Sequence, residues 1–574
     1  MRVKCKKIWI MNSINKKNDN TQSAYASWPG LIVALIVAVS LSGIMDHDLW
    51  TPDEPREAAI SLSMSQSGNL IVPELAGKPF VEKPPLFYVI SSFFLLVFGK
   101  IIGNTAALRL VSACFGLGTL LFTYLLGKIY FDRQKALFAA GILATMFGFV
   151  HVTHWLLVDN ALMFFIIASI WALAQAYESN RLPYLMLAGI FAAFAFLAKG
   201  MIGPLIIFIA WLGLFIPWVI KSGHRQLKFL GYHALALIAF GLISAIWIIA
   251  FALEGGPELF REWWWTNHFG RFSGQATELG HISPWYYYFG VLPVYILPWL
   301  APFIAALGNM FKKIWRKESF PPGMLLFSCW IFGAFLLFSL SATKREIYLC
   351  AFLPACALFC VNSLKEQLSG LEKTIYRLWL MLLFAATALG ITAPFVAHKF
   401  FEIPPVLLVD WRQIPALAAI LIALFTIFNL RTPFLRRFLI VSMMLYSALL
   451  TIYCPLVDAH KNYSSAFRAA GSAINKHPEL KIAAWKLDET TVAGFYYYCG
   501  LVFPPISDQK TLDDILQGRN ARFNGALTLK KNAHPNDLPD GKNPVIFESR
   551  MGKRRLLQLL AAPDWNMKGK EPEK

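Results

Sequence analysis

The chain has 574 residues, of which 57% are hydrophobic and 15% are charged, and its mean hydropathy is +0.51. A typical soluble domain is about 45–50% apolar and about 25% charged, so this composition excludes a disordered chain, a collagen-like fibre and an ordinary cytosolic enzyme. Aromatic residues make up 15% of the chain, and aromatic rings are enriched at both interfaces of a bilayer. The composition therefore predicts a polytopic α-helical membrane protein.

The formal net charge of +19 would suggest nucleic-acid binding if the protein were soluble. Here the basic residues lie mostly in short loops between apolar segments, where they orient a membrane protein by marking its cytoplasmic side. We therefore expect no nucleic-acid partner, although part of the excess is available for an anionic substrate.

The eight cysteines show no metal-ligand spacing and indicate no disulfide framework. Three of them, Cys350, Cys356 and Cys360, lie in one apolar stretch. We expect them to pack as small buried hydrophobic residues.

Fourteen apolar segments are candidates for membrane spans. The first, 28–45, follows a Lys-rich N-terminus, Met1–Asn20, which places that end in the cytoplasm. The second, 85–99, opens with two prolines and is shorter than the roughly 20 residues needed to cross a bilayer. If this segment lies along the interface, six basic loops fall on the cytoplasmic side, and this agreement predicts 13 spans with the C-terminus outside. The other candidate segments are 105–128, 136–155, 159–177, 183–198, 201–220, 229–252, 285–308, 323–341, 347–364, 375–397, 413–430 and 434–455.

Three features of the sequence then lie on the outer face. They are a loop rich in charge and proline (46–104), a loop dense in Trp, His and Gly (253–284), and a polar tail (456–574). The tail alternates extended with helical patterns and predicts a small α/β domain, so we divide the chain into a transmembrane domain, 1–455, and a C-terminal domain, 456–574. The extended segments are 480–486 and 543–548, and the helical segments are 463–474 and 511–516.

The outer loop 46–104 contains two groups of charged residues. Asp53 and Glu54 follow the first span directly, flanked by prolines and followed by Arg56. Further on, Glu82 and Lys83 precede two prolines that open the interfacial segment. A lysine held rigidly at this level can bind a phosphate near the bilayer surface.

Three other charged sites fall on the same face. Asp159 lies in a tight turn between two spans, and an ionisable group at such a place is costly without a partner. Lys199 links two short spans, and Lys344 with Arg345 places two cations on the side where the orientation rule predicts few. Acids and bases therefore converge next to lipid, which is typical of a reaction on a lipid-borne phosphate. The converging residues are Asp53, Glu82, Lys83, Asp159, Lys199, Lys344 and Arg345.

These motifs resemble a known family. The chain is similar to the GT-C integral-membrane glycosyltransferases that use polyprenyl-phosphate sugars, above all the bacterial aminoarabinose transferases of lipid A and their protein mannosyltransferase relatives. The ordered set of matches carries the resemblance, since each match alone is weak. The matching pieces are Asp53–Arg56, Lys78–Leu86, Leu108–Ser112, Val158–Leu162, Phe196–Gly200, Ser283–Tyr287 and Lys344–Leu349.

The resemblance implies a GT-C fold with about 13 transmembrane helices and a small periplasmic α/β C-terminal domain. It also implies roles for individual residues, with Asp53 facing the acceptor, basic residues on the polyprenyl phosphate, and a divalent metal ion near Glu82 in some relatives. No other cofactor is expected. The candidate residues are Asp53, Glu54 and Asp159 for catalysis; Arg56, Lys83, Lys199, Lys344, Arg345 and Tyr348 for substrate binding; and Glu82 for the metal.

The function that the resemblance implies is transfer of a sugar from undecaprenyl phosphate to a lipid A phosphate at the periplasmic face of the bacterial inner membrane. The sugar would be 4-amino-4-deoxy-L-arabinose or a similar one. The partners are then the lipid-linked donor, lipid A and the bilayer. Two departures leave the sugar and the acceptor open: Glu54 is followed by Pro55 where many of these transferases carry Gly, and the segment 341–349 lacks the usual Pro before Tyr.

Two alternatives remain. One is a protein O-mannosyltransferase or another envelope glycosyltransferase. The other is a flippase or transporter of lipid-linked sugars, which would favour polar groups near the midplane and two related halves, whereas here the charges crowd one face. Mass analysis of lipid A distinguishes these functions.

Overall fold

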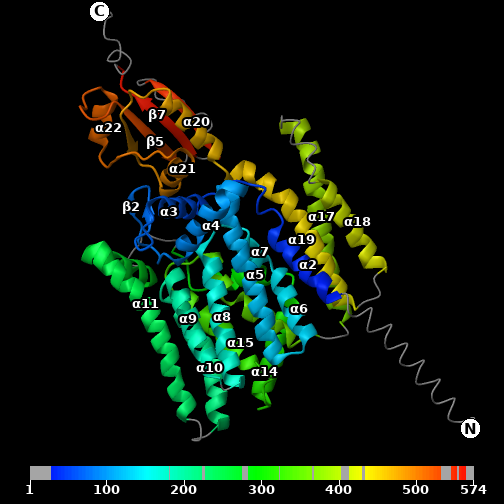
Figure 1. The fold of residues 1–574 in the computed structure, drawn as a ribbon. Helices are drawn as coiled ribbons and strands as arrows, with labels where there is room; N and C mark the ends of the chain where they lie inside the picture. Colours follow the sequence, from blue (N-terminus) through cyan, green and yellow to red (C-terminus); the bar gives the residue numbers. More distant parts are fainter. Residues whose placement is uncertain are drawn as a thin grey trace, which may run out of the picture.

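The computed structural model describes residues 28–179, 181–222, 227–273, 282–321, 323–364, 368–401, 413–429, 433–531, 544–552 and 555–563. The Lys-rich segment Met1–Asn20, on which part of the predicted orientation rests, lies outside the described residues. The described chain is a bundle of helices with a small sheet-containing unit at one end (Figure 1).

Helices account for most of the described residues up to Lys461, as the composition predicts. The α-helices are α2 (Trp28–Leu41), α3 (Glu54–Ser67), α4 (Leu86–Ile102), α5 (Asn104–Tyr130), α6 (Arg133–Ala144), α7 (Phe147–Thr153), α8 (Val158–Ser179), α9 (Leu182–Lys199), α10 (Ile202–Ser222), α11 (Leu227–Arg261), α12 (Arg271–Ser273), α13 (Tyr287–Ile296), α14 (Leu300–Trp315), α15 (Met324–Leu340), α16 (Leu353–Val361), α17 (Gly370–Phe401), α18 (Gln413–Asn429) and α19 (Phe434–Lys461). A π-helix (Glu262–Gly270), a 3-10 helix (Glu346–Phe352) and the short hairpin of β1 (Glu74–Leu75) with β2 (Lys78–Pro79) complete this part.

The predicted apolar segments are all helical where the structure describes them. Seven helices are long and apolar enough to cross a membrane, and two bent pairs, α6 with α7 and α13 with α14, raise this number to nine. Five shorter apolar helices correspond to the remaining segments, among them α4, which packs against α3 and α5. The chain is thus a multi-span membrane protein, while the count of 13 spans stays a prediction.

The centre of the bundle is α8, whose apolar window is 83% buried. It packs against α5, α9 and α10. Because α8 is covered on nearly all sides by protein, its two ends are held firmly, and its first turn carries Asp159.

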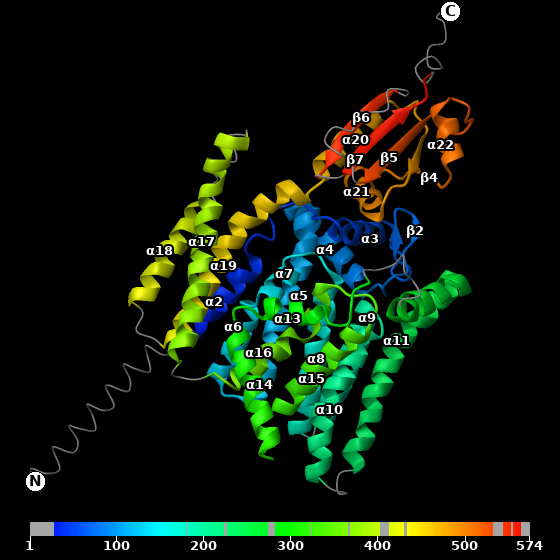
Figure 2. The same ribbon diagram turned by 180° about the vertical axis from the view of Figure 1, so that it is seen from behind.

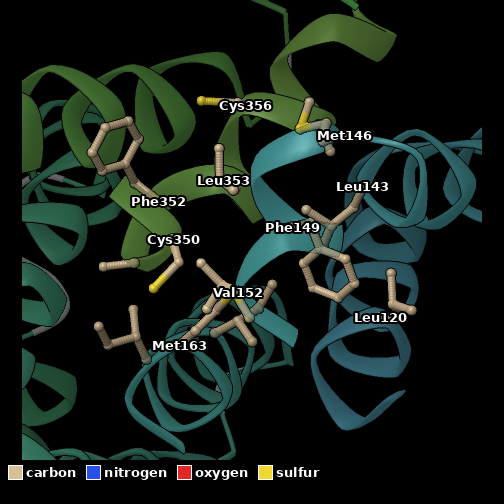
Figure 3. Close-up of a cluster of buried hydrophobic side chains, with 14 of the residues drawn as sticks. Leu120, Leu143, Met146, Phe149, Val152, Met163, Cys350, Phe352, Leu353 and Cys356 are labelled. Atoms are coloured by element: carbon tan, nitrogen blue, oxygen red, sulfur yellow. The ribbon is translucent and has the colours of Figure 1, made fainter. Parts of the chain in front are cut away.

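The predicted role of the cysteines is confirmed. Cys350, Cys356 and Cys360 are fully buried and unbridged. Figure 3 shows Cys350 and Cys356 among apolar side chains such as Phe352 and Val152. They act as small core residues between α7, α8 and the segment that follows α15.

The helix α11 bends sharply near its C-terminal end. Gly256 has a φ of +74°, a left-handed conformation that suits glycine, and Pro257 has no N–H to continue the helix. Figure 1 shows the arm beyond this bend turning away from the axis of α11 at the edge of the bundle, near β2. The arm continues into the π-helix, which brings Asn267 and Phe269 to the cavity described below.

The predicted small α/β unit is confirmed at the C-terminus. Its five-stranded sheet has the order β4-β3-β5-β7-β6, in which β3 runs parallel to β4 and β5 while the other neighbours are antiparallel. The predicted extended and helical segments correspond to β3, β6, α20 and α22, whereas α21, β5 and β7 are additional. The elements are α20 (Ser464–Asn475), β3 (Ile482–Trp485), α21 (Glu489–Cys499), β4 (Pro505–Ile506), α22 (Gln509–Leu516), β5 (Gly525–Lys531), β6 (Val545–Met551) and β7 (Arg555–Ala561).

The α/β unit rests on α3, and α21 is the helix that makes the contact (Figures 1 and 2). Three side chains of α21 hold it there. Thr490 donates to the carbonyl of Pro52 (3.0 Å), Tyr496 to Gln66 (2.9 Å) and Tyr498 to Asp48 (2.5 Å). The start of α21 is therefore fixed beside the start of α3.

Candidate active site

A cavity of about 770 Å³ lies where the start of α3, the end of α9, the segment before the 3-10 helix and the start of α21 meet. Ten ionisable side chains line it, and the segments that supply them are far apart in the sequence. The acids are Asp53, Glu57, Glu82, Asp159, Asp488 and Glu489, and the bases are Arg56, Lys83, Lys199 and Arg345.

Asp53 occupies the position immediately before α3, where an aspartate usually caps the helix. Here its side chain makes no capping hydrogen bond, and the N–H of Arg56 instead bonds the backbone carbonyl of Asp53. The carboxylate instead pairs with Arg345 through both oxygens (Nη1 to Oδ1, 3.1 Å) and with Arg56 (3.1 Å). The local sequence thus leaves Asp53 available to the cavity.

These arginines determine the charge state of Asp53. Burial by itself raises the pKa of this carboxyl, but hydrogen bonds and charge from Arg345, together with the charges of Arg56 and Lys83, outweigh it. The net result is a pKa below the ordinary value. Asp53 is therefore held ionised and is a weak base.

Arg56 is surrounded by acids. Its guanidinium nitrogens lie 3.1 Å from Asp53, 3.1 Å from Glu489, 3.5 Å from Glu57 and 3.9 Å from Glu82. The Nε–H of Arg56 is nevertheless buried and has no hydrogen-bond partner among the described residues. One turn of α3 beyond Asp53, Glu57 also binds Lys83 (2.8 Å).

A second ion pair lies on the far wall of the cavity. Asp159, near the start of α8, accepts a hydrogen bond of 2.5 Å from Lys199, the last residue of α9. The Lys199 ammonium also lies 4.4 Å from the ring centroid of Tyr348, a cation–π contact. Because α8 and α9 are packed antiparallel neighbours joined by a short connection, the start of one and the end of the other lie at the same level.

The structure does not bring Glu54 to the cavity. Its side chain is fully buried and pairs with Arg109 of α5, and it accepts hydrogen bonds from the backbone N–H groups of Trp50 (2.5 Å) and Leu156 (2.7 Å). Burial raises the pKa of this carboxyl against the opposing charge of Arg109. Glu54 joins three segments beneath the site, and the geometry places it in a supporting position instead of the predicted catalytic one.

Lys344 is also turned away from the cavity. Its ammonium donates to the carbonyl of Ser283 (3.0 Å) and to that of Ser341, and the residue is 3% exposed. These bonds fasten the segment before the 3-10 helix, whose next residue, Arg345, is the one that reaches Asp53. Of the two adjacent cations predicted to bind phosphate, only Arg345 lines the cavity.

The surroundings of Glu82 do not fit the metal ion that the resemblance implies. Its carboxylate lies 3.9 Å from the guanidinium of Arg56, a cation where a metal would need further acidic ligands. In the part of the chain that the structure describes, there is no group of three or more His, Cys, Asp or Glu side chains that could hold a metal ion. We therefore derive no chemical step through a metal.

Several cavity residues were not predicted from the sequence. Glu57 lies in the same motif as Asp53, and its spacing of four residues along a helix was a usable signal. Asp488, Glu489 and Thr490 come from the C-terminal unit, more than 400 residues later, and no local pattern marks them. Six acids therefore face four bases here, whereas the sequence alone suggested an excess of cations.

Comparison with known proteins supports the predicted fold and the resemblance. Residues 82–249 match the family model described as dolichyl-phosphate-mannose-protein mannosyltransferase. ArnT from Cupriavidus metallidurans, solved bound to undecaprenyl phosphate, superposes with a TM-score of 0.68 at 19% identity, covering 93% of this chain and 98% of that one. This likeness confirms the predicted GT-C fold with its C-terminal sheet unit.

Curated relatives confirm the resemblance to the aminoarabinose transferases. An undecaprenyl phosphate-α-4-amino-4-deoxy-L-arabinose arabinosyl transferase of Proteus mirabilis is 30% identical over 331 residues, which cover 56% of this chain and 57% of that protein. A transferase of the same description from Pseudomonas paraeruginosa is 28% identical over 401 residues, covering 67% of this chain and 69% of its own length. The chain thus spans less than two thirds of the Proteus relative and slightly more of the Pseudomonas one.

Proposed function

We propose that this protein is a glycosyltransferase that moves 4-amino-4-deoxy-L-arabinose from undecaprenyl phosphate to a phosphate group of lipid A. The observation that carries the proposal is the placement of Asp53 between Arg345 and Arg56 on the wall of a cavity lined by both charged and apolar side chains. The names of the relatives supply the donor and the sugar, and the solved neighbour with undecaprenyl phosphate supports the same donor.

Arg56 and Lys83 are the proposed partners of the donor phosphate. In the reaction the acceptor oxygen bonds to the anomeric carbon while the bond from that carbon to the phosphate oxygen breaks. Undecaprenyl phosphate leaves with the electron pair, so one negative charge on the phosphate becomes two. Cations already in place stabilise that added charge in the transition state, and the unpartnered Nε–H of Arg56 is a donor ready for a phosphate oxygen.

The polyprenyl chain requires an apolar surface that continues from the phosphate site. Met201, Leu205 and Phe338 line the same cavity as the Asp159–Lys199 pair. We propose that the first isoprene units lie along these side chains, with Lys199 and Tyr348 at the boundary between the polar and apolar parts.

The low pKa of Asp53 favours a phosphate acceptor over a hydroxyl acceptor. A general base works best when its pKa is near the operating pH, and Asp53 lies well on the acidic side. A phosphate monoester has a second pKa of about 6 and is largely ionised at neutral pH, so it needs positioning more than deprotonation. Asp53 then acts by holding Arg345 and Arg56 in position for the donor phosphate and the acceptor phosphate. Transfer to a protein hydroxyl would instead require Asp53 to accept a proton, for which its low pKa is unsuited.

The proposed location is the bacterial inner membrane, with the cavity open to the periplasm. The charged residues of the site crowd one end of the bundle beside the α/β unit, opposite the side to which the basic loops were assigned. An arrangement of this kind also argues against a flippase, which would bind its cargo near the midplane.

The test is the mass of lipid A from cells with and without the gene. We expect a mass difference confined to aminoarabinose on the lipid A phosphates. Unchanged lipid A together with altered glycoproteins would support the protein mannosyltransferase alternative instead. Accumulation of an inward-facing lipid-linked sugar would support a flippase.

A further inference from the structure

The C-terminal unit contributes one carboxylate that stands apart from the others in the cavity. Asp488 caps α21 by accepting from Thr491 and pairs with Arg555 (2.9 Å). Among the described residues of its own unit, Glu489 has no such partner, and its side chain is 59% exposed and reaches across to Arg56 (3.1 Å). It is therefore the carboxylate around Arg56 that can be displaced at the smallest structural cost.

The backbone under Glu489 is nevertheless held firmly. The next residue, Thr490, is bonded to the carbonyl of Pro52 (3.0 Å), next to Asp53, and Tyr498 ties the other end of α21 to Asp48 (2.5 Å). An exposed carboxylate on a fixed helix start is suited to contact a ligand that enters between α3 and α21.

A donor phosphate at Arg56 changes the balance of charge around Glu489. The cavity already has six acids and four bases among its described lining residues, and the phosphate adds a further negative charge. Glu489 would lose its contact with Arg56 and face that phosphate. A donor whose sugar is neutral leaves this repulsion in place, whereas a sugar that carries an ammonium group gives Glu489 a new partner.

We propose that Glu489 binds the ammonium group of the donor sugar and thereby selects donors that carry a positive charge. This inference rests on the proposed function and extends it to a specificity-determining residue. When the donor binds, the contact between Arg56 and Glu489 breaks. Arg56 then contacts the donor phosphate and Glu489 contacts the ammonium group of the sugar, so the two residues recognise the two charged groups of the donor.

The test compares two donors with the purified full-length protein. One is undecaprenyl phosphate-linked 4-amino-4-deoxyarabinose, and the other is its N-formyl derivative, in which the nitrogen carries no charge. For the wild type, we expect kcat/KM to favour the amine by about 10- to 150-fold, the value of a hydrogen bond to a charged group. In Glu489→Gln the preference should largely disappear, because KM rises for the amine donor while the N-formyl donor, no longer repelled through its phosphate by the Glu489 charge, is used at least as well as before.

Two further variants sharpen the result. Glu489→Lys should reverse the preference by repelling the ammonium, and Glu479→Gln, which removes an acid of the same unit outside the cavity, should leave it unchanged. An equal loss on both donors in Glu489→Gln, or an intact preference, would overturn the role of Glu489 alone. If the wild type transfers neither donor, the proposed function falls and this inference falls with it.

Discussion

Two acidic residues that follow each other in the chain, Asp53 and Glu54, lie in opposite surroundings. Asp53 lines the cavity, and its carboxylate contacts two arginines that also face the cavity. Glu54 points into the protein, and its two carboxylate oxygens accept hydrogen bonds from Arg109 and from two backbone N–H groups. The pKa of Asp53 is lowered, while that of Glu54 is raised by burial.

Adjacent residues of one motif can therefore have different roles: one lines the cavity, and the other stabilises the fold beneath it. Asp53 ends the loop and Glu54 begins α3, so their side chains leave the backbone in different directions. The same division recurs in the pair Lys344 and Arg345, where one cation fastens its own segment and the other reaches the cavity. The following variants test whether the two kinds of residue fail in different ways.

The largest expected effect is a loss of stability on substitution of Glu54. Glu54→Ala leaves the guanidinium of Arg109 buried without a counter-charge, which costs about 3–5 kcal/mol of stability. We expect a large fall in the temperature of unfolding measured in detergent, with any loss of transfer following the loss of folded protein.

A double variant separates charge from packing at this site. Glu54→Leu with Arg109→Met replaces the pair by apolar side chains, and buried pairs replaced in this way are often neutral in stability. Recovery of both folding and transfer in the double variant would assign Glu54 a supporting role. A stable but inactive double variant would instead restore Glu54 as a catalytic candidate.

The next largest expected effect is a loss of transfer activity on substitution of Asp53. Asp53→Asn removes the charge that holds Arg345 and Arg56, and we expect transfer to fall by about 10²- to 10³-fold, as when one preorganised electrostatic contact is lost. Donor binding should stay close to that of the wild type, because Arg56 keeps its contacts with Glu57 and Glu82. The unfolding temperature should fall only by the stability that the Asp53 charge contributes. Wild-type transfer by the Asn variant would contradict the proposed role.

The smallest effect is a shift in the pH profile of transfer. Arg345→Gln removes the strongest influence that lowers the pKa of Asp53, so the acidic limb of kcat/KM should move to higher pH. Arg519→Gln is the matched control and should leave the limb in place, because Arg519 pairs with Asp514 on the C-terminal unit, outside the cavity. Identical pH profiles for the two variants would show that the acidic limb does not arise from titration of Asp53.

The same ion pair predicts how stability depends on pH. A carboxyl whose folded pKa lies below its ordinary value of 3.8 contributes stability that is fully present above that value. This contribution is lost as the pH falls through the lower folded pKa. In Arg345→Gln the folded pKa lies closer to the ordinary value, so the stability lost on acidification should be smaller than in the wild type, which thermal unfolding over an acidic pH series measures.

Much of the architecture could be read from the sequence because it depends on local patterns. Long apolar runs specify helices in lipid wherever they occur, and the alternating patterns of the tail were sufficient for β3, β6, α20 and α22. The helix α21 was missed, since its aromatic run Phe495–Tyr498 carries no clear helical periodicity. That omission also hid Glu489 and Thr490 from the predicted site.

What the sequence by itself determined is the class of protein, the order of its helices and a set of charged residues at one end of the bundle. Only the tertiary structure decided which of those residues face the cavity. The reason is physical: the direction of Asp53, Glu54, Lys344 and Arg345 depends on partners that are far away in the chain, such as Arg109 for Glu54 and Ser283 for Lys344. The excess of positive charge that suggested a phosphate site is, in the folded protein, a network in which each cavity cation already contacts an acid.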